Sequence, residues 1–206
     1  MKNLFIFFIC FLFSVDIFSQ VLPKQFKNDR FKELVSNHSQ IAILPLNVSI
    51  IQKENKRRSL DENQLKNQQV SISLSFITNL YKNILSSKGR KLKIKIQNPN
   101  ESLRILESKS FDLSNLDKYK SSEICDALGV NAVLRGLLVN QRTRSNALGS
   151  VSVMGLSLEN KNSFEINIFD SSNRLLWKLE KSLSSNNLNE IIFRFIDLTT
   201  SKFPYK

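Results

Sequence analysis

The segment 128–136, which reads Leu-Gly-Val-Asn-Ala-Val-Leu-Arg-Gly, constrains the fold of this chain more than any other. Glycine is favoured just after a helix, because the reversed backbone at that position needs a positive φ. The apolar run that follows Gly129 is typical of a buried strand. A helix that ends at Gly129 and passes directly into a core strand predicts an α/β architecture. The segment predicts part of the structural core and contains no catalytic motif.

The first 20 residues have the pattern of a secretory signal peptide. Lys2 supplies a positive start, and an apolar run over residues 4–13 is followed by small and polar residues near Ser19. The run is too short for a lasting membrane anchor, so we expect cleavage near Ser19 or Gln20. A retained amphiphilic anchor is the alternative. Cys10 lacks the small residues that precede a lipid-attachment cysteine, so no lipid anchor is expected there.

The chain therefore divides into a signal peptide over residues 1–20, a basic lead-in segment over 21–39 and a single α/β domain over 40–206. No segment after residue 20 is long and apolar enough for a transmembrane helix. We expect export to the periplasm or to the outer envelope, with release outside the cell as a further destination.

Hydrophobic spacing predicts the elements of this domain. In chain order they are a strand at 41–51, a helix at 61–87, a strand at 91–96, a short helix near 102–107, a helix that ends at 128, a strand at 130–139, a weak strand at 151–154, a hairpin at 164–179 and a last helix from Asn187. The order strand–helix–strand–helix–strand–strand–strand–helix predicts a sandwich-like α/β or α+β fold, with helices packed on a mixed sheet of about five strands.

Local signals refine these elements. Pro45 removes one main-chain donor, which predicts a bulge or a local edge in the first strand. Ser114 and Asp117 resemble a capping box, and Asn187 with Glu190 resembles another at the start of the last helix. The apolar stripe predicted to face inward on the long helix is Val70, Leu74, Ile77, Tyr81, Ile84 and Leu85. In the lead-in segment, Phe26, Phe31, Leu34 and Val35 have the spacing of one short helical face.

Few parts for catalysis are present. The chain has one histidine, His38, in a polar stretch, and its glycines form no phosphate-binding loop. Once residues 1–20 are removed, Cys125 is the only cysteine, which excludes an internal disulfide and a cysteine-based metal cluster. Cys125 is interpreted as a small buried hydrophobic residue. We therefore predict a protein that is not an enzyme and that has no catalytic residues, no cofactor and no metal site.

Net charge is the other informative property, at +12 for the whole chain. Such a surface attracts acidic proteins, phosphates and anionic headgroups. Export and the placement of aromatic residues on apolar faces disfavour nucleic acid as a partner. The cations that we single out as candidate partner-binding residues are Lys93, Lys95, Arg135, Arg142 and Arg144. The alternating lysines around Lys93 are also interpreted as guards of a sheet edge, and Arg135 as a residue that leans toward solvent or toward a partner.

Three motifs, in order, resemble a group of bacterial envelope proteins. Residues 41–46 (Ile-Ala-Ile-Leu-Pro-Leu) resemble the "IAVLPF" first strand of proteins similar to CsgG, LpoB and the amino-terminal domain of TolB. Residues 127–136 resemble the helix-to-strand segment of that group, with Asn131 where the group usually has aspartate. The pair of strands around Phe164 and Trp177 resembles its hairpin.

The resemblance implies an envelope accessory domain that works by protein contacts. Together with the signal peptide and the lack of catalytic parts, it leads us to expect an exported accessory protein that is not an enzyme. It would act through protein contacts in the assembly, secretion or regulation of a cell-envelope complex, with self-association left open. A small-ligand or anion-binding periplasmic module is the alternative, with its basic segments at 88–95 and 142–144 as the candidate binding surface.

Overall fold

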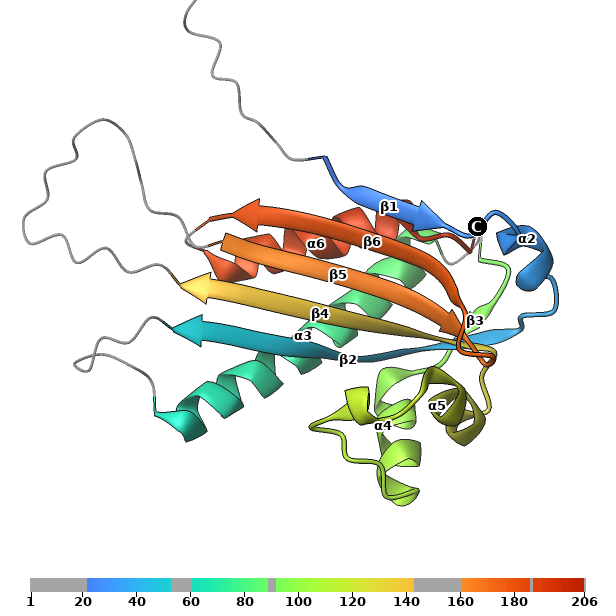
Figure 1. The fold of residues 1–206 in the computed structure, drawn as a ribbon, viewed down its shortest axis with the longest axis horizontal. Helices are drawn as coiled ribbons and strands as arrows, with labels where there is room; N and C mark the ends of the chain where they lie inside the picture. Colours follow the sequence, from blue (N-terminus) through green and yellow to red (C-terminus); the bar gives the residue numbers. More distant parts are fainter. Residues whose placement is uncertain (1–21, 53–60, 89–91, 143–160, 186, 206) are drawn as a thin grey trace, which may run out of the picture.

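The computed structural model describes residues 22–52, 61–88, 92–142, 161–185 and 187–205. Its centre is a mixed six-stranded sheet with the strand order β1-β6-β5-β4-β2-β3 (Figure 1). The strands are β1 (Lys24–Lys27), β2 (Gln40–Gln52), β3 (Lys95–Ile96), β4 (Ala132–Arg142), β5 (Lys161–Asp170) and β6 (Leu175–Ser184). The helices are α2 (Phe31–Leu34), α3 (Glu62–Lys88), α4 (Pro99–Ser108), the 3-10 turn η2 (Leu116–Lys118), α5 (Ser121–Leu128) and α6 (Leu188–Lys202).

This arrangement confirms the predicted α/β class, with six strands where the sequence indicated about five. Strand β2 pairs in parallel with β3 and β4, and β4, β5, β6 and β1 continue the sheet in antiparallel order. The change to antiparallel pairing after β4 and the hairpin between β5 and β6 are as predicted. The predicted weak strand at 151–154 lies outside the described residues.

Strand β1 was not predicted. It comes from the lead-in segment and adds to the edge of the sheet, where Lys24 pairs with Glu180 and Lys27 with Trp177. All four of its residues are exposed, so it has none of the alternating burial that marks a strand in a sequence. Main-chain pairing rather than side-chain burial therefore holds it. The short helix predicted for this segment forms only at α2, where Phe31 is buried, whereas Phe26 lies in β1.

The strand predicted over 91–96 forms only at Lys95 and Ile96. Its position at the end of the strand order confirms an edge. The pairing is short because the chain leaves the edge at once. Gln97 turns inward and donates its main-chain N–H to the carbonyl of Ile41 at 2.8 Å, and α4 begins two residues later.

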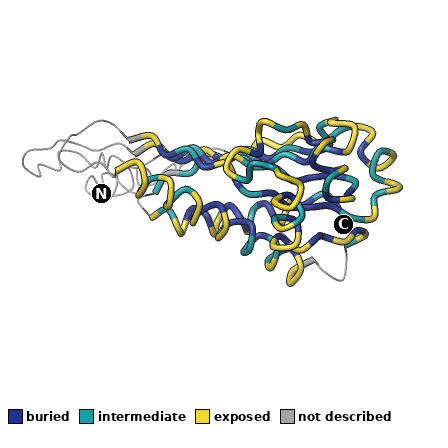
Figure 2. Tube along the Cα trace, turned by 90° about the horizontal axis from the view of Figure 1, so that it is seen from below, coloured by how far each residue is buried: buried dark blue, intermediate teal, exposed yellow. Residues whose placement is uncertain are grey.

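Two layers of side chains cover the two faces of the sheet. Helices α3 and α6 cover one face, and the larger core there includes Phe76, Phe164 and Phe195. Helices α4 and α5 cover one end of the opposite face, where a smaller core forms around Ala42 and Val133. Figure 2 shows the buried residues gathered between sheet and helices, with exposed residues around the rim.

The helix-to-strand junction forms as predicted. Gly129 follows α5 with φ 67° and ψ 36°, and its N–H donates to the carbonyl of Cys125. The side-chain oxygen of Asn131 then accepts hydrogen bonds from the N–H of Ser39 (2.8 Å), its hydroxyl (3.1 Å) and the N–H of Gln40 (3.0 Å). All three groups donate, so an aspartate carboxylate would serve equally at this position. This side chain joins the starts of β2 and β4.

Pro45 has the predicted effect on β2. The pairing with β4 shifts register between Ile43 and Leu46, which is the bulge expected where one main-chain donor is missing. The capping box at Asn187 is also confirmed in part, since its side-chain oxygen accepts from the N–H of Glu190 at 3.2 Å.

The predicted capping box at Ser114 is wrong. Asp112 accepts the N–H of Ser114, which the box would give to the carboxylate of Asp117, and Asp117 pairs with Arg135 instead. Helix α5 instead begins at Ser121, where the carboxylate of Glu123 accepts the N–H of Lys120 at 2.8 Å. The competing local hydrogen bond to Asp112 moved the helix start toward the C-terminus.

The inward stripe predicted for α3 is correct only in part. Ile77 and Ile84 are buried, but Val70, Leu74 and Leu85 are 47%, 43% and 39% exposed. The face that packs on the sheet is instead centred on Ile72, Phe76, Leu80 and Ile84. The predicted stripe is therefore rotated about the helix axis relative to the buried face. Val70 and Leu74, on the apolar flank of α3, are not covered by any described element.

Candidate functional site

Among the described elements, α4 and α5 cover the face of the sheet opposite α3 and α6, and they cover it at one end only. Side chains alternate along each strand, so one set of residues from β2, β4, β5 and β6 points to this uncovered surface. We call it the open face and define it by Asn47, Ser49, Ile51, Leu137, Val139, Ser163, Glu165, Asn167, Lys178, Glu180 and Ser182, all exposed or half-buried.

Strand pairing sets these residues in rows across the sheet. One row runs from Asn47 through Leu137, Glu165 and Glu180 to Lys24 on β1. A second row joins Ser49, Val139, Ser163 and Ser182. Apolar side chains therefore lie over β4 at the middle of the face, and small or charged side chains lie over β5 and β6.

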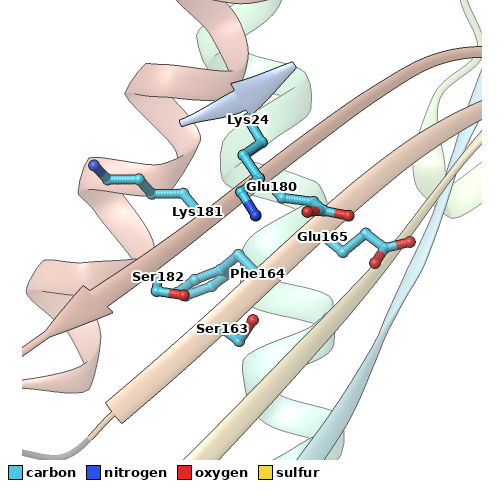
Figure 3. A pocket seen from close by; sticks show the side chains of 7 residues that line it. All are labelled: Lys24, Ser163, Phe164, Glu165, Glu180, Lys181 and Ser182. Atoms are coloured by element: carbon cyan, nitrogen blue, oxygen red, sulfur yellow. The ribbon is translucent and has the colours of Figure 1, made fainter. Parts of the chain in front are cut away.

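A shallow hollow of about 220 Å³ lies at the β1 side of the open face. Figure 3 shows the residues that line it, which are Lys24, Ser163, Phe164, Glu165, Glu180, Lys181 and Ser182. The ring of Phe164 belongs to the core on the far side of the sheet. The hollow is too small for a drug-sized ligand, for which pockets of about 300–1,000 Å³ are usual.

Lysines offset the two carboxylates of this hollow, since Lys24 lines it and Lys178 bridges the two glutamates. Glu165 and Glu180 stand directly opposite each other on β5 and β6, a like-charged pair that is unfavourable by itself. Lys178 lies between them, with its Nζ 3.2 Å from Glu165 and 2.5 Å from Glu180. The hydrogen bond to Glu180 is the main reason that the pKa of Lys178 is raised. The glutamates and lysines of this hollow therefore balance one another, and no excess of positive charge marks it as a site for an anion.

The structure does not gather the predicted cations into one site. Lys93 and Lys95 are exposed beside the β3 edge. The side chain of Arg142 and the whole of Arg144 lie outside the described residues. Partner or anion binding by these four residues stays a prediction.

Arg135 is held by its own chain. Its guanidinium, 16% exposed, donates to the carbonyls of Leu116 and Tyr119 at 2.9 Å each, and to the hydroxyl of Ser121 at 3.3 Å. It also forms an ion pair with Asp117 at 2.9 Å. Arg135 therefore ties the turn before α5 to the middle of β4, and this is the contact that the structure assigns to it.

The two side chains most capable of nucleophilic or acid–base chemistry are packed in the fold. Cys125 is 1% exposed, and burial raises the pKa of its thiol to about 12. His38 lies in the short stretch before β2, as expected, and its Nδ1 shares a hydrogen bond of 2.9 Å with the Tyr205 hydroxyl, on whose ring it stacks. Tyr205 also packs edge-on against Phe31. His38 therefore helps to fasten the end of the chain beside α2 (Figure 1).

The His38 contact predicts a loss of stability in acid. Burial lowers the pKa of His38, and this effect outweighs the nearby carboxylate of Asp170. The unfolded chain, with a histidine pKa of about 6.5, therefore binds the proton more tightly than the folded chain. Stability contributed by neutral His38 is present above pH about 6.5 and is lost as the pH falls through the lowered folded-state pKa.

Thermal unfolding at pH 7.5 and 5.5 checks this prediction. The drop in Tm between the two values is expected to be smaller in His38→Gln, which cannot take up the proton. An equal drop in the two chains would show that His38 does not couple to folding.

No three His, Cys, Asp or Glu side chains come together as a metal site within the ranges that the structure covers. Among the helices of those same ranges, none has the length and apolar character needed to cross a membrane.

Comparison with known proteins leaves the family open. No protein-family model matches the sequence. A search of curated proteins gave no match either.

Several solved structures resemble parts of the fold. The lipoprotein GNA1162 from Neisseria meningitidis has a TM-score of 0.48 and 12% identity, over 80% of this chain and 96% of that one. The PelC dodecamer from Paraburkholderia phytofirmans has a TM-score of 0.43 and 9% identity, over 87% and 94%. The LpoB C-terminal domain from Salmonella enterica has a TM-score of 0.39 and 7% identity, over 74% and 91%.

LpoB is thus one of the proteins named in the motif resemblance that also appears among the structural neighbours. The TM-scores and identities are too low to assign a role.

Proposed function

We propose that this chain is an exported accessory protein of the bacterial cell envelope, without enzymatic activity, that works by binding other proteins. Its task would lie in the assembly, secretion or regulation of an envelope complex. The signal-peptide pattern over residues 1–20 supports export. The three ordered motifs support the envelope setting.

The open face is the observation that carries this proposal. Leu137 is 37% exposed at its middle and Ile51 is 47% exposed at its β2 side. Polar residues surround them on β5 and β6, including the ion pairs of Lys178. An apolar centre with a polar rim is the usual composition of a protein–protein interface. A sheet face that is covered at one end and bare at the other offers such a surface without any change of fold.

The absence of a catalytic cluster in the described residues supports contact rather than chemistry. His38 and Cys125 are occupied by packing. Glu165 and Glu180, which lie directly opposite each other, are bridged by Lys178 at a partly exposed surface. A hydrolytic pair would need one carboxyl group with a raised pKa in a dry pocket.

The proposal is tested by placing a charge at the centre of the open face. In Leu137→Lys, we expect chemically crosslinked envelope fractions to contain at least about tenfold less of the high-mass complex formed by the unmodified protein, because the charge must be desolvated. Phe193→Lys is the matched control, since Phe193 is 56% exposed on α6, behind the sheet. Unmodified protein that runs only as a monomer, or an undiminished complex in Leu137→Lys, would refute this function for the open face.

A further inference from the structure

The outer edge of β2 is largely unpaired. In the part of the chain that the structure describes, β3 pairs with β2 only at Gln40 and Ile41. Residues 46–51 pair with β4 on their inner side and with no strand on their outer side. Within the described ranges, the main-chain donors and acceptors along this edge have no strand partner on that side, so an added strand could pair with them.

This edge also lacks the charges that normally prevent such pairing. The β1 edge carries Lys24 and Lys27, and β3 carries Lys95. Residues 46–51 read Leu-Asn-Val-Ser-Ile-Ile, with neither a charged residue nor a proline after Pro45. Lysine and proline are the usual guards of an exposed edge. The β1 edge and the short strand β3 thus carry lysines, whereas residues 46–51 of β2 carry no such charge.

An apolar flank of α3 lies near this edge of β2. Val70 and Leu74 are one turn apart and are 47% and 43% exposed. The other side of the helix faces α6, where Ser71, Ser75 and Asn79 line a hollow of about 110 Å³ with residues of α6. Val70 and Leu74 therefore point away from α6, toward the β2 side of the sheet.

Helix α3 extends beyond the sheet on that side. In Figure 1 its first turns project past β2, and the helix begins where β2 ends. The N-terminal half of α3, which carries Val70 and Leu74, therefore lies near the second half of β2. A strand added about 4.8 Å beyond β2 would lie below this overhanging flank.

We propose that residues 46–51 and the Val70–Leu74 flank together bind an extended segment of a partner protein as an additional strand. The main chain of the segment would pair with the β2 edge, and every second side chain would pack against Val70 and Leu74. On the opposite side the segment would meet Ile51, which is 47% exposed. The site explains why an apolar stripe that the sequence places on α3 is left without a cover in the isolated chain.

A second copy of the chain does not fit this edge. In a two-fold pair of β2 strands, both α3 helices would lie on the same face of the joined sheet and would crowd each other beyond the β2 edges. A single extended segment has no helix to collide with. The net charge of +12 also disfavours self-pairing and favours a partner of net negative charge.

The chemistry of the site defines the segment. It needs an uncharged stretch with an apolar residue at every second position, because a charge placed under the α3 flank would lose its water without a partner. Acidic residues elsewhere on the partner would speed encounter with the basic surface. This inference rests on the proposed function, since it assumes that the chain works by binding protein.

Site-specific photo-crosslinking in the native cells tests the inference. A benzoyl-phenylalanine is placed in turn at Val70, at Leu74, at Leu137 on the open face and at Phe193 as the control. We expect adducts from positions 70 and 74, none from 193, and a crosslinked peptide whose sequence alternates apolar and small polar residues. A synthetic peptide of that sequence then serves as the probe for the purified chain.

Hydrogen exchange with this peptide distinguishes strand addition from side-chain docking. We expect the amides of residues 46–51 to become protected, with no change at β1. Val70→Lys and Leu74→Lys should each weaken peptide binding by about tenfold or more, and Phe193→Lys should change it by less than about twofold.

Several results would overturn the inference. These are no adduct at positions 70 and 74, an adduct to a second copy or to another segment of the same chain, and peptide binding without protection of residues 46–51. If position 137 captures a partner while 70 and 74 do not, the proposed function survives and the strand site is wrong. If no position captures a protein, both are wrong.

Discussion

Replacing Phe195 with alanine is expected to lower the free energy of unfolding by about 3–5 kcal/mol. Phe195 is 0% exposed at the centre of the larger core. Its ring stacks on Phe164 of β5 at 4.4 Å between centroids and lies 6.3 Å from the ring of Phe76 on α3. The single side chain thus joins α6, α3 and the sheet, and its removal leaves a cavity that three rigid elements cannot close.

Denaturant unfolding followed by circular dichroism measures this loss. The matched control is Phe193→Ala, two residues away on the same helix and 56% exposed, for which a change below about 0.5 kcal/mol is expected. Similar losses in the two variants would show that α6 is stabilised by helix propensity rather than by its packing on the sheet.

The second large effect is expected for Arg135→Ala, at about 2–3 kcal/mol. The guanidinium is the donor to the main-chain carbonyls of Leu116 and Tyr119, and its loss leaves them without that partner beside the start of α5. The ion pair with Asp117 contributes less, because the Asp117 side chain is 54% exposed. The segment between η2 and α5 should therefore loosen first.

Native-state hydrogen exchange over residues 116–124, together with the free energy of unfolding, checks this expectation. Lys95→Ala serves as the control, since Lys95 is an exposed cation on β3 and its removal should leave both measurements unchanged. If Arg135→Ala unfolds like the unmodified chain but loses its partner, Arg135 acts at an interface as the sequence first suggested, and its internal hydrogen bonds matter little.

Much of the fold could be predicted because its signals are local. The positive φ at Gly129, the missing donor of Pro45 and the cap at Asn187 each act within a few residues. The alternation of apolar and polar residues around Phe164 and Trp177 predicts two strands joined by a short turn, and β5 and β6 form this pair. Each signal depends on backbone geometry that the residue itself imposes.

Other elements could not be predicted because distant residues determine them. Strand β1 has no buried residue and exists only because β6 presents an edge to it. The capping box at Ser114 does not form because Asp112, rather than Asp117, accepts the N–H of Ser114. Gly136 carries no special φ, yet a Cβ there would lie 2.5 Å from a methyl group of Leu46 and 2.6 Å from one of Ile166, on neighbouring strands.

The candidate surfaces likewise depend partly on local residue types and partly on distant contacts. Sequence alone singled out cations by charge, but charge does not reveal where a side chain points. Arg135 is directed inward by four hydrogen-bonding partners, while Lys93 and Lys95 remain exposed at the edge. The open face and the β2 edge carry no charge pattern, so they became visible only when the strand order was known.

By itself the sequence determined the α/β class, the helix-to-strand junction at Gly129 and the apolar residues available for packing, because spacing and backbone preference act locally. Only the tertiary structure decided which apolar residues are covered. Val70 and Leu74 have the same helical spacing as the buried residues of α3, and they stay exposed because no described strand pairs with the second half of β2 on its outer side. Burial depends on what lies opposite a side chain, and helical periodicity holds no information about that.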